Sequence, residues 1–359
     1  MGFLPFGGSK NAIGLDIGSS FIKILELDLA KGKWSLVNFG MKKLPPEAVV
    51  DGQLMNSNVI VDSIRELISE QKIKTRDVVT SVSGHSVIIK KINLPLMSRA
   101  ELEESIQWEA EQYIPFDIND VNIDVQILDP AGDAGGQMEV LLVAAKKDMI
   151  NDYTAIVQEA GLSPVVMDVD SFAIENAFEL NYDVAPDDTV VLVNIGASLI
   201  NINILRGGVT AFTRDITLGG NQYTEEIQKQ LNVSYEEAEA LKIGGDIIRD
   251  AQAVVPEEVE SIIRQVSNNV ATEIQRSLDF YAATAAEDEI RGIFVSGGTA
   301  RVPGLARAIQ EKTGLAVELV NAFRRIEIDE KAFNVDFLTE VGSMASVAVG
   351  LAMRRSDDQ

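Results

Sequence analysis

Apolar residues along this chain follow two spacings, and segments of the two kinds alternate. Residues 13–25 read IGLDIGSSFIKIL, an apolar run that meets two small residues and then continues with every second position apolar. In 57–71, 99–114 and 259–281 the apolar residues instead recur at the spacing of a helical face. Alternation fits β-strands, and the wider spacing fits amphipathic helices. Strands and helices that follow each other in this way predict an α/β fold.

The first apolar run has a second copy in the middle of the chain. Residues 191–203 read VLVNIGASLININ, and at a fixed offset the Ile-Gly pair, the second small residue and the following isoleucines coincide with those of 13–25. Asp16 then falls on Asn194. Each copy fits two strands joined by a tight Gly-Ser turn. The repeat predicts a duplicated architecture, although two unrelated hairpins with glycine turns would give the same local pattern.

The segment between the copies belongs to the first half only. Residues 84–162 fit a strand, a helix, a strand and a helix, which makes them an insertion. The second half is mostly helical after RDITLGG at 214–220, until a buried strand leads into GGT at 297–299. The last helix, 341–353, consists almost entirely of small and apolar residues. We therefore expect it to pack closely against another element.

Charge and composition exclude several classes of function. The 359 residues carry 31 Lys and Arg against 55 Asp and Glu, a formal net charge of −24. Such a charge disfavours nucleic acid and anionic membrane surfaces as partners. There is no Cys, and His85 is the single His, so disulfides, Cys nucleophiles and metal sites with two imidazoles are excluded. Beside Gly84, His85 is expected to be a turn residue.

Nothing in the sequence predicts a membrane span. No stretch reaches the roughly 18 consecutive apolar residues that a spanning helix needs, and the N-terminal MGFLPFGGSK lacks the organisation of a signal peptide. We therefore expect a cytoplasmic protein that reaches a membrane only through a partner.

The two glycine turns carry the candidate chemistry. Backbone N–H groups in such a turn can bind anions, phosphate in particular, and two turns that face each other could hold a triphosphate from both sides. Asp16 could bind the water shell of Mg²⁺, which takes few carboxylates. Lys23 could neutralise a phosphate, with a solvated strand residue as the alternative.

These motifs resemble those of the actin-like ATPases. The runs IGLDIGSSFIK, VLVNIGAS, IFVSGGTARVPGL and VGSMASVAVGLA are similar to the two phosphate loops, the adenosine loop and the second connecting helix of that superfamily. An insertion in the first half resembles FtsA and the PilM family, and KKINLP, ESIQWEAEQYIPFDI and MEVLLVAAKKDMINDYTAIVQEAGLSP resemble the PilM family of type IV pilus assembly proteins. The final RRSDDQ differs from the amphipathic membrane-targeting helix of FtsA.

The resemblance implies a duplicated actin-like (ribonuclease H-like) ATPase fold with an inserted subdomain, 1C. Subdomain 1A would span 1–83 and 1C would span 84–162. Subdomain 2A would comprise 163–221 and 291–359, with the last helix able to return to 1A, and the helical subdomain 2B would be 222–290.

The resemblance also implies that ATP or ADP, with Mg²⁺, binds between the halves. The positions that it implies are Asp16, Gly18, Ser19, Ser20 and Lys23 in the first loop, Asn194, Gly196, Ala197 and Ser198 in the second, Glu239 and Lys242 near ribose and adenine, and Gly297, Gly298 and Thr299 on the adenine side. Asp170 corresponds approximately to the residue that orients the attacking water in members of this superfamily. Alternatively, Asp170 is only an acidic residue at the N-terminus of a helix, where it interacts favourably with the helix dipole. In this superfamily the second phosphate loop commonly carries Asp where this chain has Asn194. The missing carboxylate predicts that ATP binds but is hydrolysed slowly or not at all.

The partner that the resemblance implies is the cytoplasmic N-terminal tail of PilN, an inner-membrane protein. The tail would lie between the first subdomain and the insertion, as an extended peptide that gains main-chain hydrogen bonds and side-chain pockets. Its expected walls are Ile89, Ile92, Leu94, Tyr113, Pro115 and Phe116, although these residues would also serve to pack the insertion itself. Other pilus-complex proteins and cytoplasmic pilus ATPases, and a role in twitching motility, are further expectations.

Two other functions stay open at this point. One is a filament-forming division protein like FtsA, and the other is a small-molecule kinase of the actin-like superfamily. The kinase is less favoured because the chain has no obvious sugar-binding cluster of Asp, Asn and His.

Overall fold

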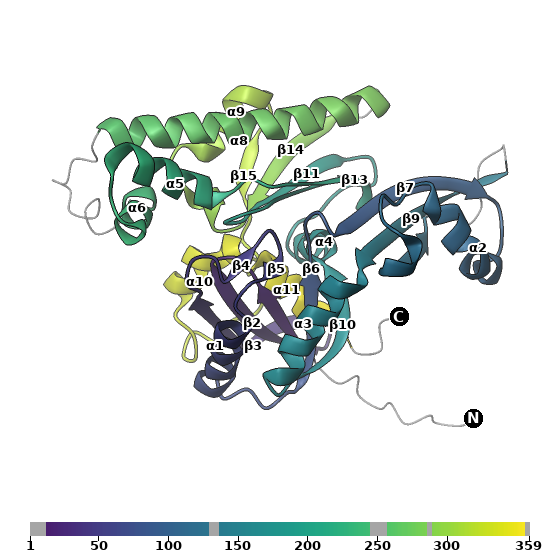
Figure 1. Cartoon of the computed structure of the whole chain (residues 1–359), viewed down its shortest axis with the longest axis horizontal. Helices are drawn as coiled ribbons and strands as arrows, with labels where there is room; N and C mark the ends of the chain where they lie inside the picture. Colours follow the sequence, from purple (N-terminus) through teal and green to yellow (C-terminus); the bar gives the residue numbers. More distant parts are fainter. Residues whose placement is uncertain (1–11, 129–135, 245–256, 286–288, 356–359) are drawn as a thin grey trace.

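The computed structural model describes residues 12–128, 136–244, 257–285 and 289–355. The N-terminal segment considered above lies outside these residues. Figure 1 shows one body around the first sheet, a second body under the long helix α8 (Glu257–Thr284), and the insertion as a lobe to one side.

Each body is built on a five-stranded sheet. The first, in the order β10-β6-β1-β2-β3, contains β1 (Ile13–Ile17), β2 (Phe21–Ala30), β3 (Lys33–Lys43), β6 (Asp77–Val82) and β10 (Ser163–Val169). The second, in the order β13-β12-β11-β14-β15, contains β11 (Thr189–Ile195), β12 (Ile200–Arg206), β13 (Val209–Ile216), β14 (Ile290–Ser296) and β15 (Val317–Leu319).

The two sheets share one topology. In each, three antiparallel strands follow one another along the chain, and two further strands add in parallel beside the first of the three. The local repeat of the sequence is therefore one part of a repeated sheet, and the predicted duplication is confirmed.

Helices cover both sheets. They are α1 (Ser57–Glu70), α3 (Lys147–Glu159), α4 (Asp170–Asn181), α5 (Gly220–Leu231), α6 (Tyr235–Lys242), α8 (Glu257–Thr284), α9 (Leu305–Thr313), α10 (Val335–Val341) and α11 (Ser346–Met353). Helix α6 begins at a capping box in which Ser234 and Glu237 satisfy each other's backbone N–H groups. Apolar residues of α8, among them Val259, Val266 and Ile274, are buried against the second sheet.

The insertion forms a small sheet of its own, in the order β7-β9-β8. Its strands are β7 (Val87–Pro95), β8 (Val121–Ile127) and β9 (Gln137–Lys146), and α2 (Arg99–Glu111) buries Leu102, Ile106 and Ala110 against them. The sequence pattern predicts one strand after α2, whereas the structure has two, β8 and β9. The 3₁₀ turn η1 (Ile118–Asp120) leads into β8.

Two boundaries differ from those expected. Met149 and Tyr153 of α3 are buried in the core of the first body, so the insertion ends at β9 and not at residue 162. Strand β10 pairs in parallel with β6, which places 163–169 in the first sheet and not with the second half. Parallel pairing joins strands that are far apart in sequence, so local patterns do not reveal it.

Helices α4 and α11 lie between the two bodies. Helix α11 packs against β1, and its Leu351 joins Ala173 and Ile174 of α4 in one core. The segment Val335–Met353 has the length and mean hydropathy (1.4) of a membrane span, and 67% of that apolar window is buried inside the fold.

The contact between α4 and α11 generates a prediction for Gly350. A Cβ built on Gly350 would lie 1.7 Å from the carbonyl oxygen of Ala173. Gly350→Ala should therefore lower the free energy of unfolding by roughly 3 kcal/mol through overpacking, although alanine is intrinsically the better helix former by about 1 kcal/mol. Urea denaturation measures the difference. Equal or greater stability of the variant would contradict this helix contact.

Candidate functional site

The turns of the two repeated hairpins face each other. In the first, the Gly18 N–H donates to the Phe21 carbonyl at 3.1 Å, and in the second the Gly196 N–H donates to Leu199 at 2.8 Å. The Oγ atoms of Ser19 and Ser198 lie 2.5 Å apart. The two turns therefore meet across the space between the bodies, as the nucleotide hypothesis requires.

The same cross-strand position holds different chemistry in the two hairpins. In the first, Asp16 lies opposite Lys23, and their carboxylate and ammonium form an ion pair at 2.6 Å. In the second, Asn194 lies opposite Asn201, and the Asn194 amide nitrogen donates to the Asn201 amide oxygen at 3.0 Å. Both members of the ion pair are nearly 90% buried (side-chain exposure 11% and 12%). The duplicated frame thus keeps a charged pair on one side and a neutral pair on the other.

One further hydrogen bond fixes Asn194, and another fixes its partner Asn201. Its amide oxygen accepts a hydrogen bond from Ser296 at 3.2 Å, and the Asn201 amide nitrogen donates to a carboxylate oxygen of Asp215 at 2.8 Å. Burial raises the pKa of Asp215, while the hydrogen bond from Asn201 lowers it. Asp215, in the segment RDITLGG, is not among the site residues that the sequence predicts.

Asp170 begins α4 close to the first hairpin. The Ser81 hydroxyl donates to its carboxylate at 2.6 Å. Burial and then the negative charge of Asp16 raise the pKa of Asp170 to about 6, against the hydrogen bonds from Ser81 and Ser83, and Asp215 adds to the rise. A carboxyl with such a pKa can exchange a proton near neutral pH, as a general base must.

A buried polar cluster lies behind the second turn. The Lys242 ammonium donates to the Thr224 hydroxyl at 3.0 Å and to the Gly220 carbonyl at 3.3 Å, and it forms an ion pair with Glu239. Burial lowers the pKa of Lys242. The Thr299 hydroxyl donates to the Gly196 carbonyl at 2.7 Å. The predicted residues of α6 and of the 297–299 turn are therefore brought to the second loop.

Glycines allow this close packing. Gly297 has φ +88°, and a Cβ there would lie 2.3 Å from the Ile195 carbonyl oxygen. A Cβ at Gly219 would lie 2.6 Å from the carbonyl oxygens of Gly196 and Ala197. Gly219 and Gly220 were not among the predicted site residues. The Gly-Gly pair in the sequence indicates a close backbone approach, but the sequence does not show that this approach is to the Gly196–Ala197 turn.

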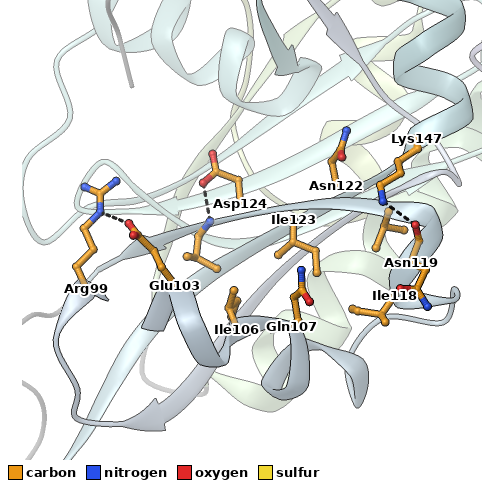
Figure 2. A pocket seen from close by; sticks show the side chains of 12 residues that line it. Arg99, Glu103, Ile106, Gln107, Ile118, Asn119, Asn122, Ile123, Asp124 and Lys147 are labelled. Carbon is orange, nitrogen blue, oxygen red and sulfur yellow. Dashed lines mark hydrogen bonds and ion pairs between the residues drawn. The ribbon is translucent and has the colours of Figure 1, made fainter. Parts of the chain in front are cut away.

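The insertion contains an open groove, with a volume of about 400 Å³, between α2 and the edge strand β8. Figure 2 shows Ile106 and Gln107 of α2 facing Ile123 of β8, with Ile118 and Asn119 at one end. The predicted partner residues lie elsewhere in the lobe: Ile92 and Leu94 are buried under α2, Ile89, Tyr113 and Phe116 are half-buried, and Pro115 is exposed.

Within the described residues, no group of three or more His, Asp or Glu side chains could hold a metal ion directly. Asp16 could still hold a magnesium ion through water, because Mg²⁺ keeps most of its water shell. Its partner Lys23 limits how much negative charge it offers.

The comparisons with known proteins agree with this geometry. A family model described as type IV pilus assembly protein PilM matches residues 14–356. In the solved PilM-PilN type IV pilus biogenesis complex, a chain is 30% identical, with 98% of this chain and 100% of that chain covered and a TM-score of 0.85. The cell division protein FtsA of Bacillus subtilis (strain 168) is 23% identical over 83% of this chain and 76% of its own length.

A more distant structure bears on the fold alone. MreB5 of Spiroplasma citri bound to ADP is 13% identical, with 96% and 95% of the two chains covered and a TM-score of 0.53. These similarities and the two repeated sheets identify the architecture as the duplicated actin-like fold that the resemblance implied, with its insertion in the first half.

The contacts of Asn194 generate a prediction. In Asn194→Asp, a carboxylate oxygen would replace the amide nitrogen that faces the Asn201 oxygen, so two acceptors would oppose each other. We expect the free energy of unfolding to fall by roughly 1–3 kcal/mol. Urea denaturation measures it, with Asn268→Asp on the exposed face of α8 as the control for the same chemical change. A stable Asn194→Asp protein would show that this amide network contributes little.

Proposed function

The chain belongs to the PilM family of type IV pilus assembly proteins, and on this premise we propose that it is a cytoplasmic nucleotide-binding scaffold of the pilus inner-membrane complex. It binds ATP between the two hairpin turns and the cytoplasmic N-terminal tail of PilN on its insertion. Through PilN it is held at the inner membrane. The observation that carries the nucleotide part is the meeting of the two turns at Ser19 and Ser198.

The chemistry of the two turns suits a nucleotide's phosphates. Gly18 and Gly196 leave the backbone open to close approach, and N–H groups in such turns bind anions. Lys23 supplies a cation beside the first turn, and Asp16 supplies a carboxylate for the water shell of Mg²⁺. Glu239 and Lys242, which form an ion pair beside the second turn, are the residues that we propose for the ribose and adenine.

We propose that ATP turns over slowly or not at all. Asn194 brings no negative charge, and its amide is occupied by Ser296 and Asn201. Phosphoryl transfer depends on positioned charge, so a neutral second loop affects turnover more than binding. Asp170 is the remaining candidate to orient an attacking water.

The groove between α2 and β8 is the proposed site of the PilN tail. The solved complex of a similar chain with PilN supports PilN as the partner. An extended peptide can add to an edge strand by main-chain hydrogen bonds, and β8 is an edge strand of the insertion sheet. Ile106 and Ile123 offer apolar walls, and Lys147 at the start of α3 lines one end of the groove together with Asn119. This placement keeps the tail at the junction with the first body.

For the nucleotide, we expect Lys23→Ala to weaken Mg²⁺-ATP binding at least about tenfold, because a charge-assisted hydrogen bond contributes about 1.5–3 kcal/mol. Calorimetry measures the dissociation constant. Lys33→Ala removes an exposed lysine that pairs with Glu327, far from the turns, and should leave binding unchanged. If the wild-type protein gives no binding heat with Mg²⁺-ATP, the nucleotide proposal is wrong, and brisk phosphate release would contradict slow turnover.

For the tail, we expect Ile123→Gln to weaken binding of a peptide from the PilN N-terminus roughly tenfold or more. The groove then loses an apolar side chain whose burial against the peptide contributes about 1.5–3 kcal/mol. Fluorescence anisotropy of the labelled peptide measures it. Gln126→Ala, an exposed position on the other face of the same strand, is the control. Equal affinity of the Ile123→Gln and wild-type proteins would place the tail elsewhere.

A further inference from the structure

Lys43 lies beside the first turn and is not one of the site residues described above. It ends β3, where it pairs across the strands with Phe21, the residue that follows the turn. The next residue is tied to the turn itself, because the backbone N–H of Leu44 donates to the carbonyl of Ser20 at 2.8 Å. The backbone therefore fixes the exposed Lys43 at the edge of the turn that we propose for the phosphates.

Lys43 is on the same face of the first sheet as the ion pair of the site. Side chains that lie directly opposite each other on neighbouring strands share a face, and so do residues two positions apart along one strand. Asp16, Lys23 and Met41 lie opposite one another and form one row across three strands. Lys43 comes two positions after Met41 and lies in the next row toward the turn. Two lysines from adjacent rows therefore face the same side of the sheet.

A lysine of the second body lies close enough to Lys43 for their charges to interact. Burial lowers the pKa of Lys242, the charge of Glu239 opposes this shift, and the positive charge of Lys43 adds to it. The two ammonium groups repel each other, although one belongs to β3 of the first body and the other to α6 of the second. An anion held between the two lysines would offset this repulsion.

The three lysines around the turns differ in their partners. Lys23 forms an ion pair with Asp16, and Lys242 forms one with Glu239. Within the described part of the chain, the Lys43 ammonium has no ion-pair or hydrogen-bond partner. A lysine that is paired with a carboxylate offers less net charge to a ligand than an unpaired lysine does. Lys43 is thus the lysine at these turns whose charge is uncompensated.

We propose that Lys43 binds the nucleotide at the phosphate next to the ribose. This inference rests on the proposed function, in which the phosphates lie at the turns and Glu239 and Lys242 contact the ribose and adenine. A cation that is beside the first turn and also near Lys242 lies where these two parts of the nucleotide join. ATP and ADP share that phosphate, so Lys43 contributes to the affinity for both nucleotides and does not distinguish between them.

The test measures the dissociation constants of Mg²⁺-ATP and Mg²⁺-ADP by calorimetry at low salt. Lys43→Gln removes the charge and keeps most of the length of the side chain. We expect it to weaken both nucleotides by the same factor, roughly fivefold, which is the upper range for an exposed ion pair. Lys43→Arg keeps the charge and should stay within about twofold of the wild-type protein. Added salt should reduce the loss in Lys43→Gln, because exposed charges are screened.

Lys42→Gln is the matched control. Lys42 is the neighbouring residue of β3, but it forms an ion pair with Glu66 of α1. Because successive side chains of a strand point to opposite faces, Lys42 does not share the face of Lys43. The control makes the same chemical change one residue away and should leave both dissociation constants unchanged.

The possible outcomes separate this inference from the proposed function. If the wild-type protein binds neither nucleotide, the proposed function is wrong, and this inference with it. If the wild-type protein binds and Lys43→Gln binds equally well, or if Lys42→Gln loses as much affinity, the role of Lys43 is wrong and the proposed function stands. A loss that is confined to ATP would also overturn the inference, because Lys43 would then contact the terminal phosphate.

Discussion

The structure depends on the meeting of two hairpin turns that come from equivalent positions of a duplicated sheet. Neither turn makes a site alone, because each offers only a few backbone N–H groups and one hydroxyl. The two sheets are fixed relative to each other by α4 and α11, whose backbones approach so closely at Gly350 that no side chain fits. The distance between Ser19 and Ser198 therefore reports on how the two bodies stand against each other.

Duplication provides the frame, and divergence provides the chemistry. Position for position, Asp16 and Lys23 correspond to Asn194 and Asn201. A second ion pair at this position would add another buried carboxylate near Asp215, where burial already disfavours the charged form. The Asn194–Asn201 pair avoids this cost, because the Asn201 amide nitrogen donates to Asp215 and the Asn194 amide oxygen accepts from Ser296. Asn194 is thus explained by its neighbours, independently of any loss of catalysis.

The sequence was sufficient for features that local patterns encode. The glycine turns, the duplication and the long helix α8 follow from spacing, and the family resemblance brought the residues of α6 and of the 297–299 turn to the site. Features set by pairing between distant segments were not accessible. Asp215 reaches the site only because β13 pairs with β12, and β10 joins the first sheet only through β6. In the insertion, the resemblance implied a peptide-binding wall at Ile92 and Leu94, but the structure buries both side chains under α2.

The balance of charge in the cleft connects these observations. Burial, and after it the negative charges of Asp16 and Asp215, raise the pKa of Asp170. Lys23 already neutralises Asp16 through their ion pair. A triphosphate would add further negative charge, so it must either take Lys23 from Asp16 or arrive with Mg²⁺. If it takes Lys23, Asp16 loses its partner inside a buried site and becomes free to bind the water shell of the ion. Nucleotide and metal are therefore expected to enter together, because each removes an electrostatic penalty that the other would face alone.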